Sequence, residues 1–174
     1  MTDILVERQW PQPLTEHAMM AMFSAAESCL VIHRLAWCGS LLSADGLDLL
    51  CHFRGPDAES ARIAMRQLGS PPGRVWTCCT HDAPGIVEAD LATVQVVISH
   101  RFDAPTDVGM QMLEERSAGC SSVHRVRIVR RYLSLDGLRV DWLCQAPDAE
   151  SVRLAQRHAD LPPGRIWAVR RFAP

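Results

Sequence analysis

A long segment of this chain occurs twice. Residues 56–76 read PDAESARIAMRQLGSPPGRVW and residues 147–167 read PDAESVRLAQRHADLPPGRIW, with 13 of 21 positions identical at an offset of 91. The same offset, without a gap, relates further pairs: Thr15 and Thr106, Met19 and Met110, Cys29 and Cys120, His33 and His124, and Asp45-Gly46 and Asp136-Gly137. Such internal self-similarity predicts that one structural unit is built twice.

Hydrophobic periodicity and turn signals predict six elements in each copy. Thr15 is a typical N-cap before an apolar helical run, and Asp45-Gly46 is a typical hairpin turn. In the first copy these elements are a strand at 4–9, a helix from 15 to about 29, strands at 34–43 and 47–54, a helix from 56 to about 68, and a strand at 74–80. In the second copy the corresponding strands are predicted at 95–101, 125–134, 138–145 and 165–172, and the helices at 106–119 and 148–159. This order, strand-helix-hairpin-helix-strand, is that of the ferredoxin-like βαββαβ fold.

The strand at 47–54 predicts how each sheet is covered. Leu47, Leu49, Cys51 and Phe53 form one apolar phase, whereas the alternate residues are mixed in polarity. By the two-residue period of a strand, the apolar phase faces the helices and the mixed phase faces the other side. We therefore expect an α+β fold in which two tandem repeats, 1–82 and 94–174 with a linker at 83–93, pack open face to open face as a pseudo-dimeric α+β barrel.

Composition excludes several function classes. All 18 basic residues are arginine, so the chain has neither a Schiff-base lysine nor the lysine of a phosphate loop. The net charge is −2, and it is uneven: residues 1–90 carry 6 arginines against 11 acids, and residues 91–174 carry 12 against 9. Opposite charges on the two copies favour their docking, and neither copy resembles a nucleic-acid-binding surface.

The chain shows no sign of a targeting or membrane segment. Its first ten residues lack the basic start and apolar run of a signal peptide, and no stretch approaches the roughly 18 apolar residues of a membrane span. Seven cysteines without a C-x-x-C pattern suit reduced, mostly buried thiols. These features predict a soluble, cytoplasmic protein.

The order and spacing of several short motifs resemble a known family. The motifs are L-V-E-R near the start, the D-G hairpin, Cys51 ahead of the P-D-A-E-S helix, and P-P-G-R-[VI]-W. Together they resemble a bacterial ferredoxin-like family, largely of unknown function, that includes nickel-binding proteins. The resemblance covers both copies, and it implies paired units and, in some members, nickel. Members of that family carry a histidine in W-x-H-S-Y and another in the second helix. In this chain the first histidine is replaced by Gly39 and Arg130 in the two copies, and the second by Ala64 and Ala155.

Two equivalent histidines are the candidate metal ligands. His33 and His124 each follow the first helix of their copy, and imidazole is a good ligand for nickel, zinc or another divalent transition metal. The alternative is that both are turn residues retained for local hydrogen bonding. No H-x-x-x-H or H-E-x-x-H motif supports either one.

Six further residues are candidates for binding a small molecule. Glu7 lies in the first strand, and His52 and Arg54 lie on the mixed phase with Asp141 of the second copy. His100 takes the place of Gln9, and Arg130 belongs to an arginine-rich strand that has no counterpart in the first copy. A raised carboxylate pKa or an arginine fork would suit binding or proton transfer, whereas interior ion pairs and a charged edge strand are the simpler interpretations.

Three hypotheses of function follow from these observations. The first is a small ligand-binding protein that takes an organic molecule or a divalent transition metal such as nickel at the repeat interface. The second is a cofactor-independent enzyme acting on a small molecule within the barrel. The third is a structural or partner-binding protein, because the fold by itself fixes no function. All three assume an intramolecular pseudo-dimer that can pair further as a homodimer.

Overall fold

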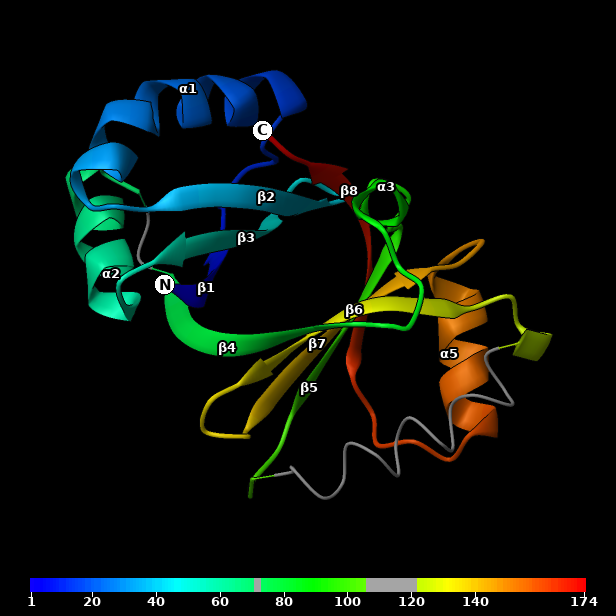
Figure 1. The fold of residues 1–174 in the computed structure, drawn as a ribbon. Coiled ribbons are helices and arrows are strands. Elements are labelled where there is room, and N and C mark those ends of the chain that lie inside the picture. The colour runs from blue at the N-terminus through cyan, green and yellow to red at the C-terminus, as the bar shows by residue number, and fades with distance from the viewer. Residues whose placement is uncertain (71–72, 106–121) are drawn as a thin grey trace. The chain divides into compact units, whose positions relative to one another are not determined.

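The computed structural model describes residues 1–70, 73–105 and 122–174. The helix predicted at 106–119 therefore lies outside the described residues. The chain divides into two compact units (Figure 1): unit 1 comprises 1–78 with 172–174, and unit 2 comprises 79–171. The repeat boundaries predicted at 82 and 94 stay a prediction, and the segment predicted as a linker contains the short helix α3 (Glu88–Leu91).

Unit 1 is an antiparallel sheet with two helices on one face (Figure 1). Its strands pair in the order β4-β1-β3-β2, which is the ferredoxin-like order. The elements are β1 (Thr2–Gln9), α1 (Glu16–Ile32), β2 (Ala36–Ser43), β3 (Asp48–Gly55), α2 (Ala58–Gln67) and β4 (Arg74–Asp82).

Local sequence explains where these helices and turns begin. The Thr15 side chain accepts a hydrogen bond from the backbone N–H of Ala18, and Asp57 accepts one from Ser60 at the start of α2. The pKa of the Asp57 carboxyl is lowered, because hydrogen bonds from the backbone and side chain of Ser60 favour its charged form. Gly46, in the β2–β3 turn, has φ +76°, and a Cβ there would lie 2.9 Å from the Leu14 carbonyl oxygen. Glycine is therefore required at this turn.

The core of unit 1 lies between the sheet and its helices. The predicted apolar phase of β3 is buried, with Phe53 and Cys51 fully enclosed. The remaining buried members of this cluster are Ile4, Val6, Met19, Phe23, Ala26, Leu30, Leu35, Leu42, Leu49, Ala61, Ala64 and Met65. The prediction that this phase faces the helices is confirmed.

Unit 2 repeats the sheet order as β8-β5-β7-β6. Its described elements are α3, β5 (Val96–Arg101), β6 (Arg127–Ser134), β7 (Arg139–Gln145), α5 (Ala149–His158) and β8 (Arg165–Phe172). Val96, Ile98, Trp142 and Cys144 belong to its buried cluster, and burial raises the pKa of Cys144 to about 12. The α+β composition and the ferredoxin-like sheet order are thus confirmed for both units, whereas the barrel stays a prediction.

Backbone details recur at the offset of 91. The positive φ of Arg34 returns at Arg125, that of Gly46 at Gly137, and that of Gly69 at Asp160. The bulge of β2 between Trp37 and Gly39 returns in β6 between Ile128 and Arg130. The repeated sequence therefore builds repeated local geometry, well beyond the segment that is nearly identical.

The first strand departs from this offset by one residue. Arg8 pairs with Leu49 and His100 pairs with Val140, so the β3 and β7 partners are 91 apart but the first-strand residues are 92 apart. The ungapped alignment was therefore wrong here, and His100 corresponds to Arg8 rather than to Gln9. The physical reason is that hydrogen-bond register, which fixes the face of each side chain, determines equivalence in a strand.

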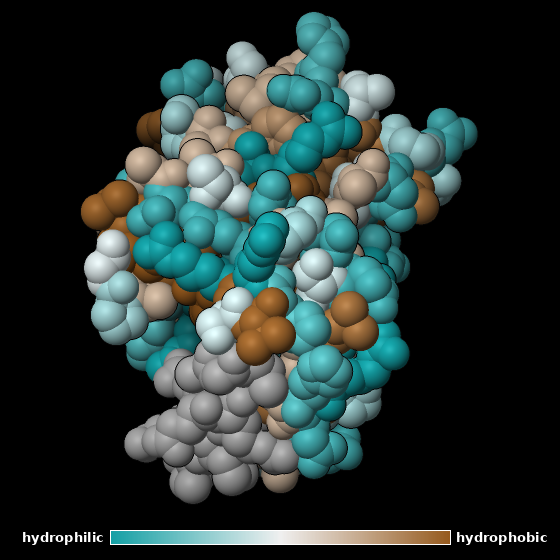
Figure 2. All heavy atoms as spheres, turned by 90° about the vertical axis from the view of Figure 1, so that its right-hand side faces the viewer, coloured by the Kyte–Doolittle hydropathy of each residue, from teal (hydrophilic) through white to brown (hydrophobic). Residues whose placement is uncertain are grey.

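The surface and the thiols complete the description. On the face shown in Figure 2, hydrophilic side chains predominate and hydrophobic ones lie scattered among them. Among the described ranges, no helix is both long and apolar enough to traverse a bilayer. None of the six cysteines in the described ranges is joined in a disulfide, and Cys51, Cys78 and Cys144 are buried.

Candidate functional site

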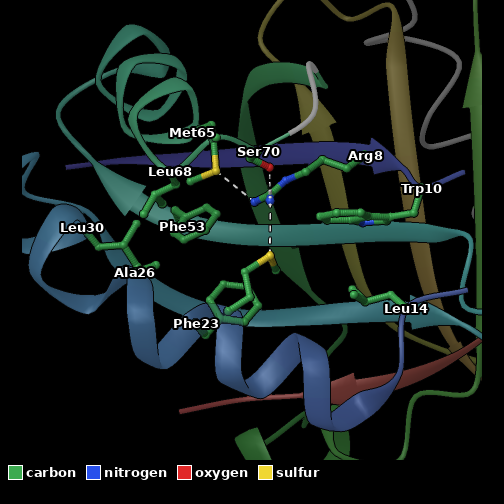
Figure 3. A pocket seen from close by; sticks show the side chains of 12 residues that line it. Arg8, Trp10, Leu14, Phe23, Ala26, Leu30, Phe53, Met65, Leu68 and Ser70 are labelled. Carbon is green, nitrogen blue, oxygen red and sulfur yellow. Dashed lines mark hydrogen bonds between the residues drawn. The ribbon is translucent and has the colours of Figure 1, made fainter. Parts of the chain in front are cut away.

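Unit 1 contains a cavity of about 310 Å³ between its sheet and its helices. Residues of β1, β3, α1, α2 and the segments that follow β1 and α2 line it: Arg8, Trp10, Leu14, Met22, Phe23, Ala26, Leu30, Phe53, Met65, Leu68, Gly69 and Ser70. In Figure 3, Arg8 and Trp10 reach into this cavity from one end, and Leu30, Leu68 and Phe53 lie toward the other. The cavity is thus apolar along most of its wall and polar at one end.

Arg8 is the charged group of this cavity, and it is only 5% exposed. Its Nη1 donates to the Ser70 hydroxyl at 2.5 Å, its Nη2 lies 2.9 Å from the Met65 sulfur, and Nη1 lies 4.0 Å from the Met22 sulfur. Its Nε–H finds no acceptor in the described part of the chain. The guanidinium group of arginine stays charged in proteins. A hydroxyl and thioether sulfurs are neutral and therefore weak partners for that charge. No carboxylate among the described residues balances this buried charge.

Strand register explains why Arg8 points into the core. Ile4, Val6 and Arg8 share one phase of β1, and Ile4 and Val6 belong to the buried cluster beneath the helices. Sequence reasoning missed Arg8 because it searched the mixed phase for polar ligand groups. The available signal was an arginine on the apolar phase of a strand, where a charge is costly unless it is paired.

Trp10 adds a second unsatisfied donor to the cavity. It directly follows β1, and its backbone N–H donates to the Leu47 carbonyl at 2.8 Å. Its indole Nε1–H is buried and has no acceptor within residues 1–70, 73–105 and 122–174. Buried indole N–H groups usually find an acceptor, so two unfilled N–H donors in one cavity are unusual. The lining of this cavity thus combines one buried positive charge with two residues whose N–H donors lack a described acceptor.

Unit 2 has a different polar pair at the equivalent place. His100, which corresponds to Arg8, is buried on β5, and its Nε2 lies 3.1 Å from Nε2 of Gln156 on α5. Gln156 in turn corresponds to Met65 at the offset of 91. The predicted ligand residue His100 thus lies beneath α5, and its Nδ1 has no hydrogen-bond partner among the residues that the structure describes. Burial lowers its pKa. Gly164 is required beside it, because a Cβ there would lie 2.8 Å from the imidazole.

The lowered pKa of His100 predicts acid sensitivity of folding. In the unfolded chain the imidazole protonates near its ordinary pKa of about 6.5, whereas the folded imidazole resists protonation. As pH falls through that value, the unfolded state takes up a proton first, and the free energy of unfolding decreases. We expect His100→Gln to lose less stability than the wild type between about pH 7.5 and about pH 5.5, measured by urea denaturation. Between about pH 7.5 and 8.5, the two proteins should respond alike, and equal acid sensitivity would contradict this role.

Three of the predicted ligand residues in unit 1 lie on the opposite face of its sheet. His52 Nε2 lies 2.8 Å from Oδ1 of Asp3, and Arg54 Nε donates to the same oxygen at 3.2 Å. Glu7 accepts a hydrogen bond from the Trp76 indole at 2.7 Å and lies 3.7 Å from Nη1 of Arg74. The structure therefore brings His52 and Arg54 together on one acid, and Glu7 is held by its own partners.

Two predicted residues of unit 2 lie on its sheet. Asp141 is 1% exposed on β7, opposite Ser99 of β5. Arg130 makes two hydrogen bonds to Asp82, from Nε at 2.6 Å and from Nη2 at 2.9 Å. The Arg130 fork is therefore occupied by a carboxylate of its own unit, whereas the Arg8 fork is not.

The predicted metal ligands each contact a residue on the helix that follows them. His33 Nε2 lies 2.8 Å from the Gln67 amide oxygen at the end of α2. His124 Nε2 lies 2.8 Å from Nδ1 of His158 at the end of α5. The equivalent turns thus use equivalent contacts, but unit 2 has two imidazoles where unit 1 has one.

The positions at which the resemblance implies nickel ligands do not supply them. Gly39 and Arg130 offer no metal-binding group, and Ala64 of α2 and Ala155 of α5 are buried alanines. Within the described ranges, no three His, Cys, Asp or Glu residues are grouped so that they could hold a metal ion. A nickel site like that of the resembled family does not fit these residues.

Comparison with known proteins adds evidence on the fold. No family model matches the chain. No curated protein matches its sequence at a significant level. Similar solved structures include a protein provisionally assigned as a chlorite dismutase (TM-score 0.50, 11% identity, 98% of this chain and 94% of that one). They also include an anthrone oxidase-like protein (TM-score 0.47, 12% identity, 99% of this chain and 93% of that one). A further one is a provisionally assigned monooxygenase from Fusobacterium nucleatum subsp. nucleatum (TM-score 0.49, 9% identity, 98% of this chain and 92% of that one). The first of these supports a shared fold over almost the whole chain.

Proposed function

We propose that this chain is a small ligand-binding protein, and that its unit 1 cavity binds a small organic acid. The ligand would place an anionic head group, such as a carboxylate, against Arg8 and an apolar chain or ring against Phe23, Phe53 and Leu30. The observation that carries this proposal is the buried Arg8 guanidinium, which has an unfilled Nε–H and no carboxylate partner in the described chain.

Energetics favour an anionic occupant over an empty or neutral one. A buried charge without a counterion costs several kcal/mol, and each unfilled buried donor costs about 1–3 kcal/mol. A carboxylate can accept from a guanidinium edge and from a neighbouring indole N–H, and such charge-assisted hydrogen bonds are roughly twice as strong as neutral ones. An organic acid would therefore offset the desolvation of Arg8 and Trp10 in one step.

The size and chemistry of the cavity support binding of a small apolar molecule. A volume of about 310 Å³ is at the lower end of the range for small-molecule sites. The described lining contains one hydroxyl, at Ser70, and no histidine, carboxylate or thiol that could transfer a proton. Binding is therefore better supported at this site than the alternative of cofactor-independent catalysis.

We also propose that the two units arose by tandem duplication and then diverged in function. Arg8 and Met65 in unit 1 stand where unit 2 has His100 and Gln156. A lowered pKa keeps the imidazole uncharged near neutral pH, and the glutamine amide already contacts it. The described residues of unit 2 thus place no fixed charge at the position equivalent to Arg8, so one acid per chain is expected.

Calorimetric titration with octanoate and with 1-octanol tests this function. The two probes share an apolar chain, but only octanoate carries an anionic head group. We expect octanoate to bind one site per chain at least about tenfold more tightly than octanol, a difference of about 1.4 kcal/mol. Equal affinity for both probes would show that Arg8 does not select an anion, and binding of neither would remove the proposal.

A further inference from the structure

The contact between His124 and His158 places two imidazole nitrogens at the separation that a metal chelate requires. His124 Nε2 and His158 Nδ1 are 2.8 Å apart, with ring centroids 4.8 Å apart and planes tilted by 52°. Two nitrogens that each lie about 2.0–2.1 Å from one metal ion are separated by about 2.9–3.4 Å. A shift of a few tenths of an ångström, together with a rotation of both side chains that turns the two lone pairs toward one ion, would open this pair to a metal.

We propose that His124 and His158 form a two-histidine site for a divalent transition metal, with water completing the coordination. Imidazole nitrogen is a preferred ligand of Cu²⁺, Ni²⁺ and Zn²⁺. Without metal, one ring donates a hydrogen to the other nitrogen. When an ion binds, the donating ring carries its hydrogen on its other nitrogen, so that both facing nitrogens offer a lone pair to the metal.

The end of helix α5 favours a cation at this place. His158 is the last residue of α5, and helix carboxyl ends carry a partial negative charge. His158 is exposed and His124 is half-buried, so an ion and its waters can reach both nitrogens. The site is local to unit 2, and it is independent of the organic-acid cavity of unit 1.

Unit 1 provides a natural comparison at the same turn. His33 Nε2 lies 2.8 Å from the Gln67 amide oxygen, and both residues are 91 positions before the histidine pair. An amide oxygen is a poor ligand for these metals compared with imidazole. The two equivalent turns thus differ in one side chain, and only the turn of unit 2 carries two imidazoles.

Two substitutions, each of which gives one turn the residue found at the equivalent position of the other, test this inference. In calorimetric titration with Ni²⁺ or Zn²⁺, we expect one site in the wild type and at least a tenfold weaker affinity in His158→Gln, which copies the unit 1 turn. Gln67→His, which copies the unit 2 turn, should add a second site of similar affinity. With Cu²⁺, electron paramagnetic resonance should show hyperfine splitting from two nitrogens in the wild type and from fewer in His158→Gln.

Controls separate this site from scattered surface histidines. His17→Gln changes an exposed histidine of α1 and should leave both affinity and stoichiometry unchanged. Circular dichroism should match the wild type for all variants, because the exchanged side chains are exposed or half-buried. No Ni²⁺ or Zn²⁺ binding by the wild type, or unchanged affinity in both His158→Gln and His124→Gln, would overturn the inference.

Discussion

Replacing Arg8 by methionine is expected to weaken octanoate binding by about 10- to 100-fold without destabilising the fold. The variant removes the charge-assisted hydrogen bonds that anchor the carboxylate, each worth about 1.5–3 kcal/mol. Methionine keeps an unbranched apolar stem in the cavity, so packing against Met65 and Met22 is retained. Calorimetric titration with octanoate measures the first effect.

The same variant is expected to match or exceed the wild type in its free energy of unfolding when no ligand is present. A buried charge without an ionic partner opposes folding, and apolar replacement of such groups is often neutral or stabilising. Urea denaturation measures this second effect. A residue that lowers stability is more easily explained by binding than by architecture.

Arg66→Met is the matched control for this experiment. Arg66 lies on α2, is 71% exposed, and its Nη2 donates to Glu59 at 3.0 Å. An exposed ion pair contributes at most about 1 kcal/mol, and this residue does not line the cavity. We expect little change in binding or stability. A strongly destabilised Arg8→Met protein that bound octanoate normally would show instead that Arg8 has a structural role.

Much of the fold could be predicted because the chain carries its unit twice. The predicted helix to about residue 68 is observed as α2, Ala58–Gln67, and its counterpart as α5, Ala149–His158. Each copy supplies independent cap and turn signals, so the two assignments support each other. The observed ends differ from the predicted ones by at most three residues, as at α1, which extends to Ile32.

The error in the first strand has an identifiable cause. Trp10 corresponds to Phe102 by register, whereas Thr15 corresponds to Thr106 by sequence, so the loop after the strand is one residue shorter in the second copy. A one-residue change in a loop leaves no strong sequence signal. An ungapped alignment then pairs each residue of one strand with a residue that lies on the opposite face of the other sheet. That shift concealed the correspondence between Arg8 and His100.

The candidate site was less predictable than the fold. His52, Arg54 and Glu7 were selected because they lie on a mixed strand phase, and the structure gives each a partner within unit 1. Arg8 was passed over on an apolar phase, where burial makes a charge most informative. Periodicity predicts which face a side chain takes, but whether a charge is paired depends on contacts distant in sequence. Met65 and Ser70, the partners of Arg8, are 57 and 62 positions away from it.

Phe53→Ala is expected to give the largest loss of stability among the variants considered for unit 1. Phe53 is fully buried on β3, pairs in register with Ile4, and packs 6.5 Å from the Phe23 ring. Truncating a buried phenylalanine to alanine costs about 3–5 kcal/mol, through lost transfer free energy and the cavity that remains. That cost is a large fraction of the typical 5–15 kcal/mol total stability, so the urea midpoint should fall sharply.

Phe53→Leu supplies the graded comparison, because it retains most of the buried volume. We expect its loss of stability to be less than half that of Phe53→Ala, since smaller volume changes leave smaller cavities. Phe53 also lines the existing cavity of about 310 Å³, so truncation merges new space with space that already exists. If the cavity walls were free to collapse, Phe53→Ala would cost little and apolar probes would bind no better. A large loss of stability together with tighter binding of a bulkier acid, such as 4-phenylbutanoate, would establish that the wall at Phe53 is rigid and limits ligand size.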